Sequence, residues 1–213
     1  MKLYGYFRSS AAFRVRIALN LKKLDYESVF VHLRRNDQSK PDYRAVNPQG
    51  LVPTLEDGEA SLIQSLAIIE YLDEMHPDPP LLPKDPRGRA RVRGLAQIVA
   101  CDSHPLIVPR VREYLEHEFK LDEPARVKWC QHWHRMALSA LETNLADKST
   151  GRYCHGDTIT LADICLASQA AGAKFFAVDT APFANFSRIA NALSQIDAFA
   201  RAHPLKQPGA PAS

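Results

Sequence analysis

The chain lacks a strong excess of either charge. Its 27 Lys and Arg residues nearly balance its 24 Asp and Glu residues, which leaves a formal net charge of +3. So small an excess does not favour nucleic acid or an acidic membrane surface as a partner. The only basic cluster places an arginine at every second position from Arg87 to Arg93. On a helix this spacing distributes the side chains around the axis, so we interpret the cluster as a solvated helix start.

Long apolar runs and paired cysteines are also missing. No apolar segment reaches the roughly 20 residues that span a bilayer, and the first residues lack the layout of a secretory signal. The cysteines have no short paired spacing; they are Cys101, Cys130, Cys154 and Cys165. We therefore expect a soluble cytoplasmic protein with reduced, mostly buried thiols. The histidines show no third ligand at a suitable spacing, so no metal site is expected.

The most informative stretch present is the one from Phe7 to Arg16. It joins a predicted strand over residues 2–7 to a helix predicted by the apolar spacing from Val15 to Leu21. Ser9 and Ser10 lie at the joint, where serine is a favoured N-cap. A helix start stabilises an anion, and two hydroxyls suit a small one such as a thiolate. On this stretch alone, a simple helix cap explains the serines at least as well.

The first 76 residues predict a β-α-β unit followed by a β-β-α unit. Strands are expected over residues 26–31, 51–56 and 60–63, and helices near 42–46 and from 66 to about 75. The first two strands should be parallel, because a crossover through a helix joins them. The last two should form a hairpin around Asp57-Gly58.

A proline-rich segment, His76 to Pro83, is the clearest boundary. We expect a first domain over residues 1–80, a linker over 81–86 and an all-helical domain over 87–213. Its helices are predicted over 87–119 (bent or interrupted at Pro105 and Pro109), 124–146, 161–175 and 186–199. Thr160 and Asp163 resemble a capping box, and the tail from Pro204 to Ser213 is expected to be loose.

Together these pieces resemble the cytosolic glutathione transferases, and within them the zeta class, the maleylacetoacetate and maleylpyruvate isomerase family. The motifs that carry the resemblance are Tyr6-Phe7-Arg8-Ser9-Ser10, Arg14-Val15-Arg16-Ile17-Ala18-Leu19, Asn47-Pro48, Val52-Pro53-Thr54-Leu55 and Gln64 to Leu72. It extends through Leu161-Ala162-Asp163 to the segment Asp179 to Pro182. The resemblance implies an α/β thioredoxin-like N-terminal domain (βαβ-ββα), an all-α C-terminal domain, a homodimer and glutathione as cofactor.

The resemblance also implies where glutathione binds. A cis peptide bond at Pro53 would turn the Val52 N–H and C=O outward, to pair with the cysteinyl part as an added strand would. Ser65 would begin a helix whose free N–H groups hold the γ-glutamyl carboxylate, with Gln64 helping to orient it. Gln49 would reach the glycine end.

Residues of the helical half complete the implied site. An acid near Asp102 and His104 meets the glutathione amine in related enzymes; for these two residues alone, a helix-surface role is an equally good interpretation. Arg110 aligns with an arginine that grips substrate, although a salt bridge explains it as well. The family often has a further arginine where this chain has Phe175, so that contact is missing here or has moved to Lys174.

The implied chemistry starts from the glutathione thiol, of which only the thiolate is a good nucleophile. A hydrogen bond from Ser9 or Ser10 would lower the thiol pKa, and Ser9 aligns with the activating serine of the family. Arg8, beside the serines, would bind a carboxylate or stabilise an enolate. The family pattern continues with cysteine where this chain has Ala11, which argues against reductive dehalogenation.

The resemblance therefore implies cis–trans isomerisation of a dicarboxylic maleyl-keto acid, by thiolate addition, bond rotation and elimination, with glutathione returned unchanged. A general transferase or peroxidase acting on electrophiles is the alternative, and Phe175 favours it because it makes the acceptor pocket more apolar. A non-catalytic binding protein is the third, and the intact serine and cis-proline motifs speak against it. The sequence does not choose between maleylpyruvate and maleylacetoacetate.

Overall fold

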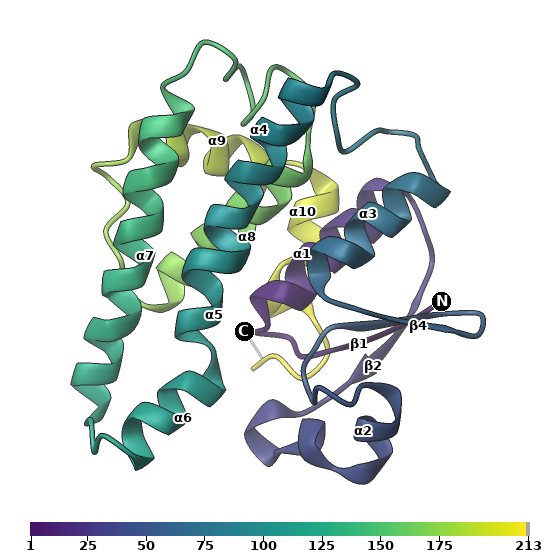
Figure 1. Ribbon diagram of the computed structural model, residues 1–213, viewed down its shortest axis with the longest axis vertical. Helices are drawn as coiled ribbons and strands as arrows, with labels where there is room; N and C mark the ends of the chain where they lie inside the picture. The colour runs from purple at the N-terminus through teal and green to yellow at the C-terminus, as the bar shows by residue number, and fades with distance from the viewer. Residues whose placement is uncertain (212–213) are drawn as a thin grey trace. The chain divides into compact units, whose positions relative to one another are not determined.

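The computed structural model describes residues 1–211, and these form two compact units (Figure 1). One unit contains Met1–Leu81 together with Gln195–Ser213, and the other contains Leu82–Ser194. Sequence patterns alone group residues 195–213 with the helical half. The contacts group residues 195–211 with the first unit, because the helix Asp197–Ala202 packs on the helix Ser10–Leu21. The expected domain limits of 1–80 and 87–213 stay a prediction.

The first unit is built on a four-stranded mixed sheet. Its strands are β1 (Lys2–Gly5), β2 (Glu27–Phe30), β3 (Thr54–Asp57) and β4 (Ala60–Ile63), in the order β2-β1-β3-β4. β1 pairs with β2 in parallel, and β3 pairs antiparallel with both β1 and β4. This confirms the predicted βαβ-ββα order and the hairpin, whose loop is Gly58-Glu59 because Asp57 still pairs with Ala60.

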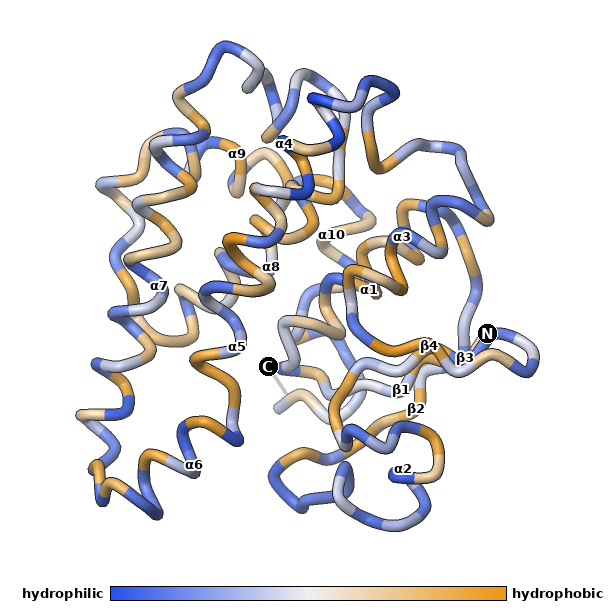
Figure 2. The backbone as a smooth tube through the Cα atoms, viewed as in Figure 1, coloured by the Kyte–Doolittle hydropathy of each residue, from blue (hydrophilic) through white to orange (hydrophobic). Residues whose placement is uncertain are grey.

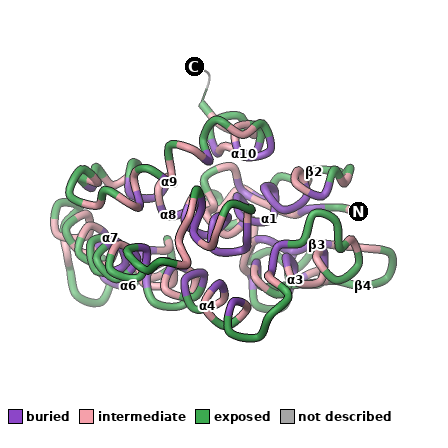
Figure 3. Tube along the Cα trace, turned by 90° about the horizontal axis from the view of Figure 1, so that it is seen from above, coloured by how far each residue is buried: buried purple, intermediate pink, exposed green. Residues whose placement is uncertain are grey.

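The helices of this unit are α1 (Ser10–Leu21), α2 (Pro41–Val46), α3 (Ser65–Met75) and α10 (Asp197–Ala202), with short 3-10 turns over Leu33–Arg35, Asp37–Ser39 and Pro204–Lys206. α1 packs against both α3 and α10, and its residues from Ala12 to Leu19 are all buried (Figure 3). Apolar residues concentrate along α1 and α3 (Figure 2). The core of the unit therefore lies along α1.

An arginine fastens the end of the chain to α1. Arg16 is buried, and its Nε donates to the Ala202 carbonyl at 3.0 Å while Nη2 donates to the Phe7 carbonyl at 3.2 Å. Asn20 donates to the Ala198 carbonyl at 2.9 Å. Since Pro204 is buried and begins a 3-10 turn, the predicted loose tail is wrong at its start. Ala212 and Ser213 lie outside the described residues.

The second unit is helical, with α4 (Pro86–Gln97), a π-helical segment (Ile98–Ser103), α5 (His104–Ile107), α6 (Pro109–His117), α7 (Glu123–Leu145), α8 (Leu161–Phe175) and α9 (Ala184–Ser194). The predicted interruption before Pro109 is confirmed, because Val108 is extended. The single helix predicted over 186–199 is wrong: Ile196 is extended, and α9 and α10 are separate. α8 packs against α4 and α9 at the centre of this unit.

The arginine cluster of α4 is not wholly solvated. Arg91 donates to the carbonyls of Cys154 at 2.6 Å and Asn144 at 3.1 Å, and to the Thr150 hydroxyl at 2.8 Å. It ties the loop after α7 to α4, so its interpretation as a solvated residue is wrong. No helix among residues 1–211 is both long and apolar enough to cross a bilayer.

Candidate active site

Ser9 is the N-cap of α1, and its geometry leaves its proton uncommitted. Its backbone is extended, and its Oγ accepts a hydrogen bond from the Ala12 N–H at 3.1 Å. A hydroxyl has one O–H donor as well as its acceptor lone pairs, and capping uses only an acceptor. The cap and a hydrogen bond to a thiolate are therefore compatible. Ser10 follows as the first residue of α1, and both serines are half-buried, after an exposed Arg8.

The segment before β3 offers an unpaired backbone edge. The Val52–Pro53 peptide bond is cis, which confirms the expectation from the family resemblance. Within residues 1–211, neither the N–H nor the C=O of Val52 has a hydrogen-bond partner. The Leu51 carbonyl just before it is held by the Tyr43 hydroxyl at 2.6 Å and by the Asn47 side chain at 2.7 Å. The loop is therefore fixed while the Val52 groups stay available to an added strand.

The turn before this edge requires a glycine. Gly50 has φ +65, and a Cβ there would lie 3.0 Å from the Gln38 carbonyl oxygen. The buried Asn47 side chain accepts from the Gln49 N–H at 3.0 Å, which is an Asx turn. Together these contacts fix the backbone of the turn, and with it the position from which the Gln49 side chain projects.

Three predicted glutathione contacts, Gln49, Gln64 and Ser65, lie at or near the start of α3. Gln64 has φ +68, an uncommon left-handed value, and its Nε2 donates to Oε1 of Gln49 at 3.0 Å. Ser65, the first residue of α3, is buried, and its Oγ accepts from Nη1 of Arg14 at 3.1 Å. The Ser65 hydroxyl proton thus remains a donor, beside the first N–H groups of the helix.

Arg14 was not predicted as a site residue from the sequence. It is a charged side chain on the buried helix α1, it is 1% exposed, and its hydrogen bond to Oγ orients the Ser65 hydroxyl. The sequence does carry a signal, because an arginine within an otherwise apolar helix is unusual unless a buried polar group needs it.

The remaining predicted residues belong to the helical unit. Asp102 lies, exposed, in the π-helical segment, and His104 directly follows that segment as the first residue of α5. Such segments occur frequently at functional sites. Arg110 is the second residue of α6 and is exposed.

The end of α8 carries the departure from the family pattern. Lys174 is exposed and Phe175 is half-buried. The next ring, Phe176, has the guanidinium of Arg112 over it, at 5.6 Å from the ring centroid. The described residues contain no group of three His, Cys, Asp or Glu side chains placed to hold a metal ion.

The chain is similar to known proteins over almost its whole length. The family description "Glutathione S-transferase, N-terminal domain" matches residues 3–80. A maleylpyruvate isomerase of Ralstonia sp. is 48% identical over 209 residues, covering 98% of this chain and 99% of the relative. The maleylacetoacetate isomerase of Pseudomonas aeruginosa is 44% identical, covering 100% of both chains.

A solved structure is similar over the same length. The crystal structure of a maleylacetoacetate isomerase from Methylobacterium extorquens AM1, with bound malonate and glutathione, is 51% identical with a TM-score of 0.98, covering 100% of both chains. The holo structure of a zeta-class maleylpyruvate isomerase has a TM-score of 0.97 at 47% identity, covering 99% of this chain and 100% of that one. The chain therefore belongs to the zeta class of the glutathione transferases, the family of the maleylacetoacetate and maleylpyruvate isomerases.

Proposed function

We propose that this protein is a glutathione-dependent cis–trans isomerase of a maleyl-keto acid. The observation that carries the proposal is the fixed loop at the cis Val52–Pro53 bond, whose unpaired N–H and C=O are suited to the cysteinyl part of glutathione. This contact would direct the glutathione sulfur toward the start of α1. Ser65 and the N–H groups of α3 would hold the γ-glutamyl carboxylate of glutathione, with Gln64 helping to orient it. Gln49 would contact the glycine end of glutathione.

The chemistry would follow from a thiolate at Ser9. The Ser9 O–H donates to the sulfur and, with the start of α1, favours its ionised form. The thiolate adds to the carbon–carbon double bond, and the electron pair moves onto the conjugated keto oxygen. The bond, now single, rotates; the electron pair returns and the thiolate leaves. The trans product forms and glutathione is unchanged, so no oxidant or reductant is needed.

Arginines would supply the contacts to the substrate. We assign Arg8 and Arg110 to the carboxylates and the developing enolate, because a guanidinium binds a carboxylate through two parallel hydrogen bonds. Asp102 and His104 are assigned to the ammonium group of glutathione. Ser10 supports the sulfur site through its N–H at the start of α1.

We further propose a cytoplasmic homodimer. The four cysteines are all free thiols, and three of them are buried, as expected for a reducing compartment. The dimer is proposed from the family resemblance alone. Sedimentation of the purified protein as a single species of twice the chain mass supports it, and a monomer at micromolar concentration contradicts it.

A second candidate function is that of a general transferase acting on electrophiles. The half-buried Phe175 at the end of α8 favours it, because a phenyl ring there offers a substrate no charge. One assay separates the two functions. Maleylpyruvate and maleylacetoacetate are each supplied with substoichiometric glutathione, and the trans product and the remaining thiol are both measured. Full conversion with the thiol retained supports the isomerase; thiol consumed by electrophiles without isomerisation supports the transferase.

Replacing Ser9 with alanine is expected to raise the pKa of the bound glutathione thiol by about one unit, or about 1.4 kcal/mol, because the charged form loses a hydrogen bond. Thiolate absorbance against pH measures it. Ser9→Thr is the matched control, since it keeps both the cap and the O–H. If the titration of Ser9→Ala is unchanged, Ser9 does not activate the thiol.

Replacing Arg110 with alanine is expected to raise the KM for the keto acid by about tenfold, because one charge-assisted hydrogen-bond pair is lost. The KM for glutathione should change little. Arg110→Lys keeps the charge but cannot form two parallel hydrogen bonds, so its KM for the keto acid should lie between those of the wild type and of Arg110→Ala. Equal increases in both KM values would argue against a carboxylate contact at Arg110.

A further inference from the structure

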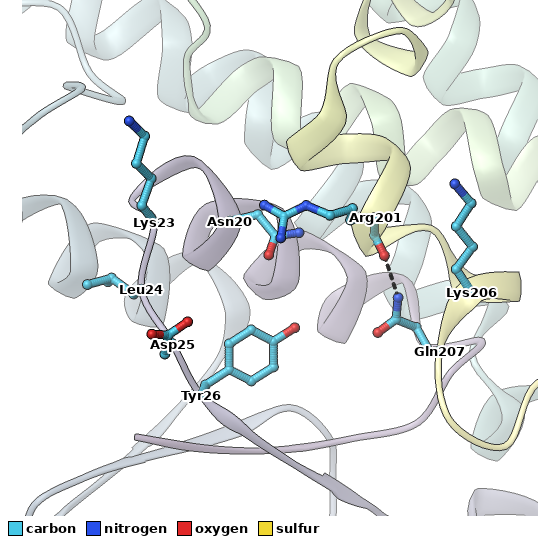
Figure 4. Close-up of a pocket in the computed structure, with 8 residues that line it drawn as sticks. All are labelled: Asn20, Lys23, Leu24, Asp25, Tyr26, Arg201, Lys206 and Gln207. Atoms are coloured by element: carbon cyan, nitrogen blue, oxygen red, sulfur yellow. Dashed lines mark hydrogen bonds between the residues drawn. The ribbon is translucent and has the colours of Figure 1, made fainter.

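A cavity of about 440 Å³ lies in the first unit, at the far end of α1 from Ser9, and Figure 4 shows the residues that line it. Three segments form it: the end of α1 with the turn that follows, α10, and the 3-10 turn after α10. None of the residues assigned above to glutathione or substrate lines it. The cavity is therefore a separate feature that the proposed isomerase does not use.

The cavity has an excess of positive charge. Lys23, Arg201 and Lys206 line it, against a single carboxylate, Asp25. The Nε of Arg201 pairs with Asp197 at 2.8 Å, and this leaves both terminal nitrogens of the guanidinium as donors. Lys23 and Lys206 stand on opposite sides of the cavity in Figure 4.

Tyr26 adds a neutral hydroxyl donor to the lining of the cavity. Burial raises the pKa of Tyr26, while the charges of Arg16 and Arg201 both act to lower it. The net increase keeps the phenol protonated at neutral pH. Within residues 1–211 its hydroxyl has no hydrogen-bond partner, so it can donate to a ligand.

Arg16 is a buried cation that forms no ion pair among residues 1–211. The residue is 3% exposed, and its guanidinium donates to the carbonyls of Phe7 and Ala202. Burial lowers its pKa to about 10, so it is still charged at neutral pH. Arg16 does not line the cavity, but its charge acts on Tyr26, which does, so an anion held by Tyr26 would also be attracted by this buried cation.

Lys23, which lines the cavity, has a backbone conformation that is unfavourable for lysine. Lys23 has φ +56 and directly follows the C-cap of α1, where the left-handed conformation usually selects glycine. Lysine there accepts a backbone cost that glycine would avoid.

We propose that this cavity binds a phosphate group, with Tyr26 and Arg201 as its hydrogen-bond donors and Lys23 and Lys206 as surrounding charges. A dianionic tetrahedral oxyanion offers acceptors in several directions, which matches donors that come from three segments. The volume exceeds that of phosphate alone, so a phosphorylated small molecule fits better than the free ion.

Calorimetric titration of the full-length protein with inorganic phosphate and with a sugar monophosphate, at constant ionic strength in chloride, tests this site. Saturable binding is expected for both, and it should be tighter for the sugar monophosphate. Arg201→Gln and Tyr26→Phe should each weaken it by about tenfold or more, as expected for the loss of a charge-assisted hydrogen bond. Asp25→Asn should strengthen it, because a repelling carboxylate is removed.

Lys148→Gln is the matched control, since it removes an exposed charge from the helical unit. It should leave binding unchanged. The absence of saturable binding, or an equal loss in Lys148→Gln and Arg201→Gln, would overturn the proposal. The thermal midpoint of each variant without ligand shows whether its fold is intact. Isomerase activity is not part of the readout, so failure here leaves the proposed function untouched.

Discussion

Replacing Asp163 with alanine is expected to lower the free energy of unfolding by about 4 kcal/mol or more, because several buried donors lose their acceptor at once. Asp163 is fully buried near the start of α8. One carboxylate oxygen accepts from the Cys154 N–H at 2.8 Å. The other accepts from the N–H and the hydroxyl of Thr160, each at 2.8 Å. Each donor left unsatisfied costs about 1–3 kcal/mol.

Asp157 provides a matched control for this prediction. Its carboxylate also accepts a backbone N–H, from Arg152 at 2.8 Å, but it is exposed, so water can replace it. Asp157→Ala is therefore expected to cost about 1 kcal/mol or less. Urea unfolding with unchanged slope measures both variants. If Asp163→Ala lies within 1 kcal/mol of Asp157→Ala, the buried network does not stabilise the fold in this way.

Lowering the pH from 7 to 4 is expected to remove about 3 kcal/mol of stability through His134 alone. This side chain is 1% exposed on α7, and neither ring nitrogen has a hydrogen-bond partner within the described residues. Burial lowers its pKa to about 4. In the unfolded chain His134 is protonated near pH 6.5, whereas in the folded chain it is protonated only near pH 4. Stability is therefore complete above pH 6.5 and falls as the pH approaches 4.

Gly172 on α8 explains why the imidazole is so deeply placed. A Cβ there would lie 2.8 Å from Cε1 of His134, so only glycine admits the ring. The test is urea unfolding from pH 7 to 4 of the wild type, His134→Leu and the exposed control His117→Gln. His134→Leu should lose about 3 kcal/mol less than the other two over this range. Identical profiles for all three would exclude His134 as the cause.

Local patterns in the sequence predict those parts of the site that local chemistry determines. Ser9 could be placed at a helix start, because a strand pattern precedes it and a helix pattern follows it. Thr160 and Asp163 form the predicted capping box, because the spacing of three is fixed by the helix itself. The cis bond at Pro53 came from the family resemblance and is confirmed.

Contacts between distant segments could not be predicted in the same way. The hydrogen bond from Gln64 to Gln49 joins a helix start to a turn 15 residues away, and no periodicity reports it. The break at Ile196 was missed because apolar residues continue across it from α9 to α10. Arg16 looked like one more residue of an amphipathic helix, although its partners are near positions 7 and 202.

The return of the chain to its first unit has a consequence for exchanging parts between relatives. Because residues 195–211 complete the unit that begins at Met1, the helical unit is an insertion with two joints, after Leu81 and after Ser194. A chimera must therefore have two crossovers, one at each joint, so that each unit comes from a single parent. A single crossover would set α1 against a foreign α10, and Arg16 would face whatever backbone replaced Ala202.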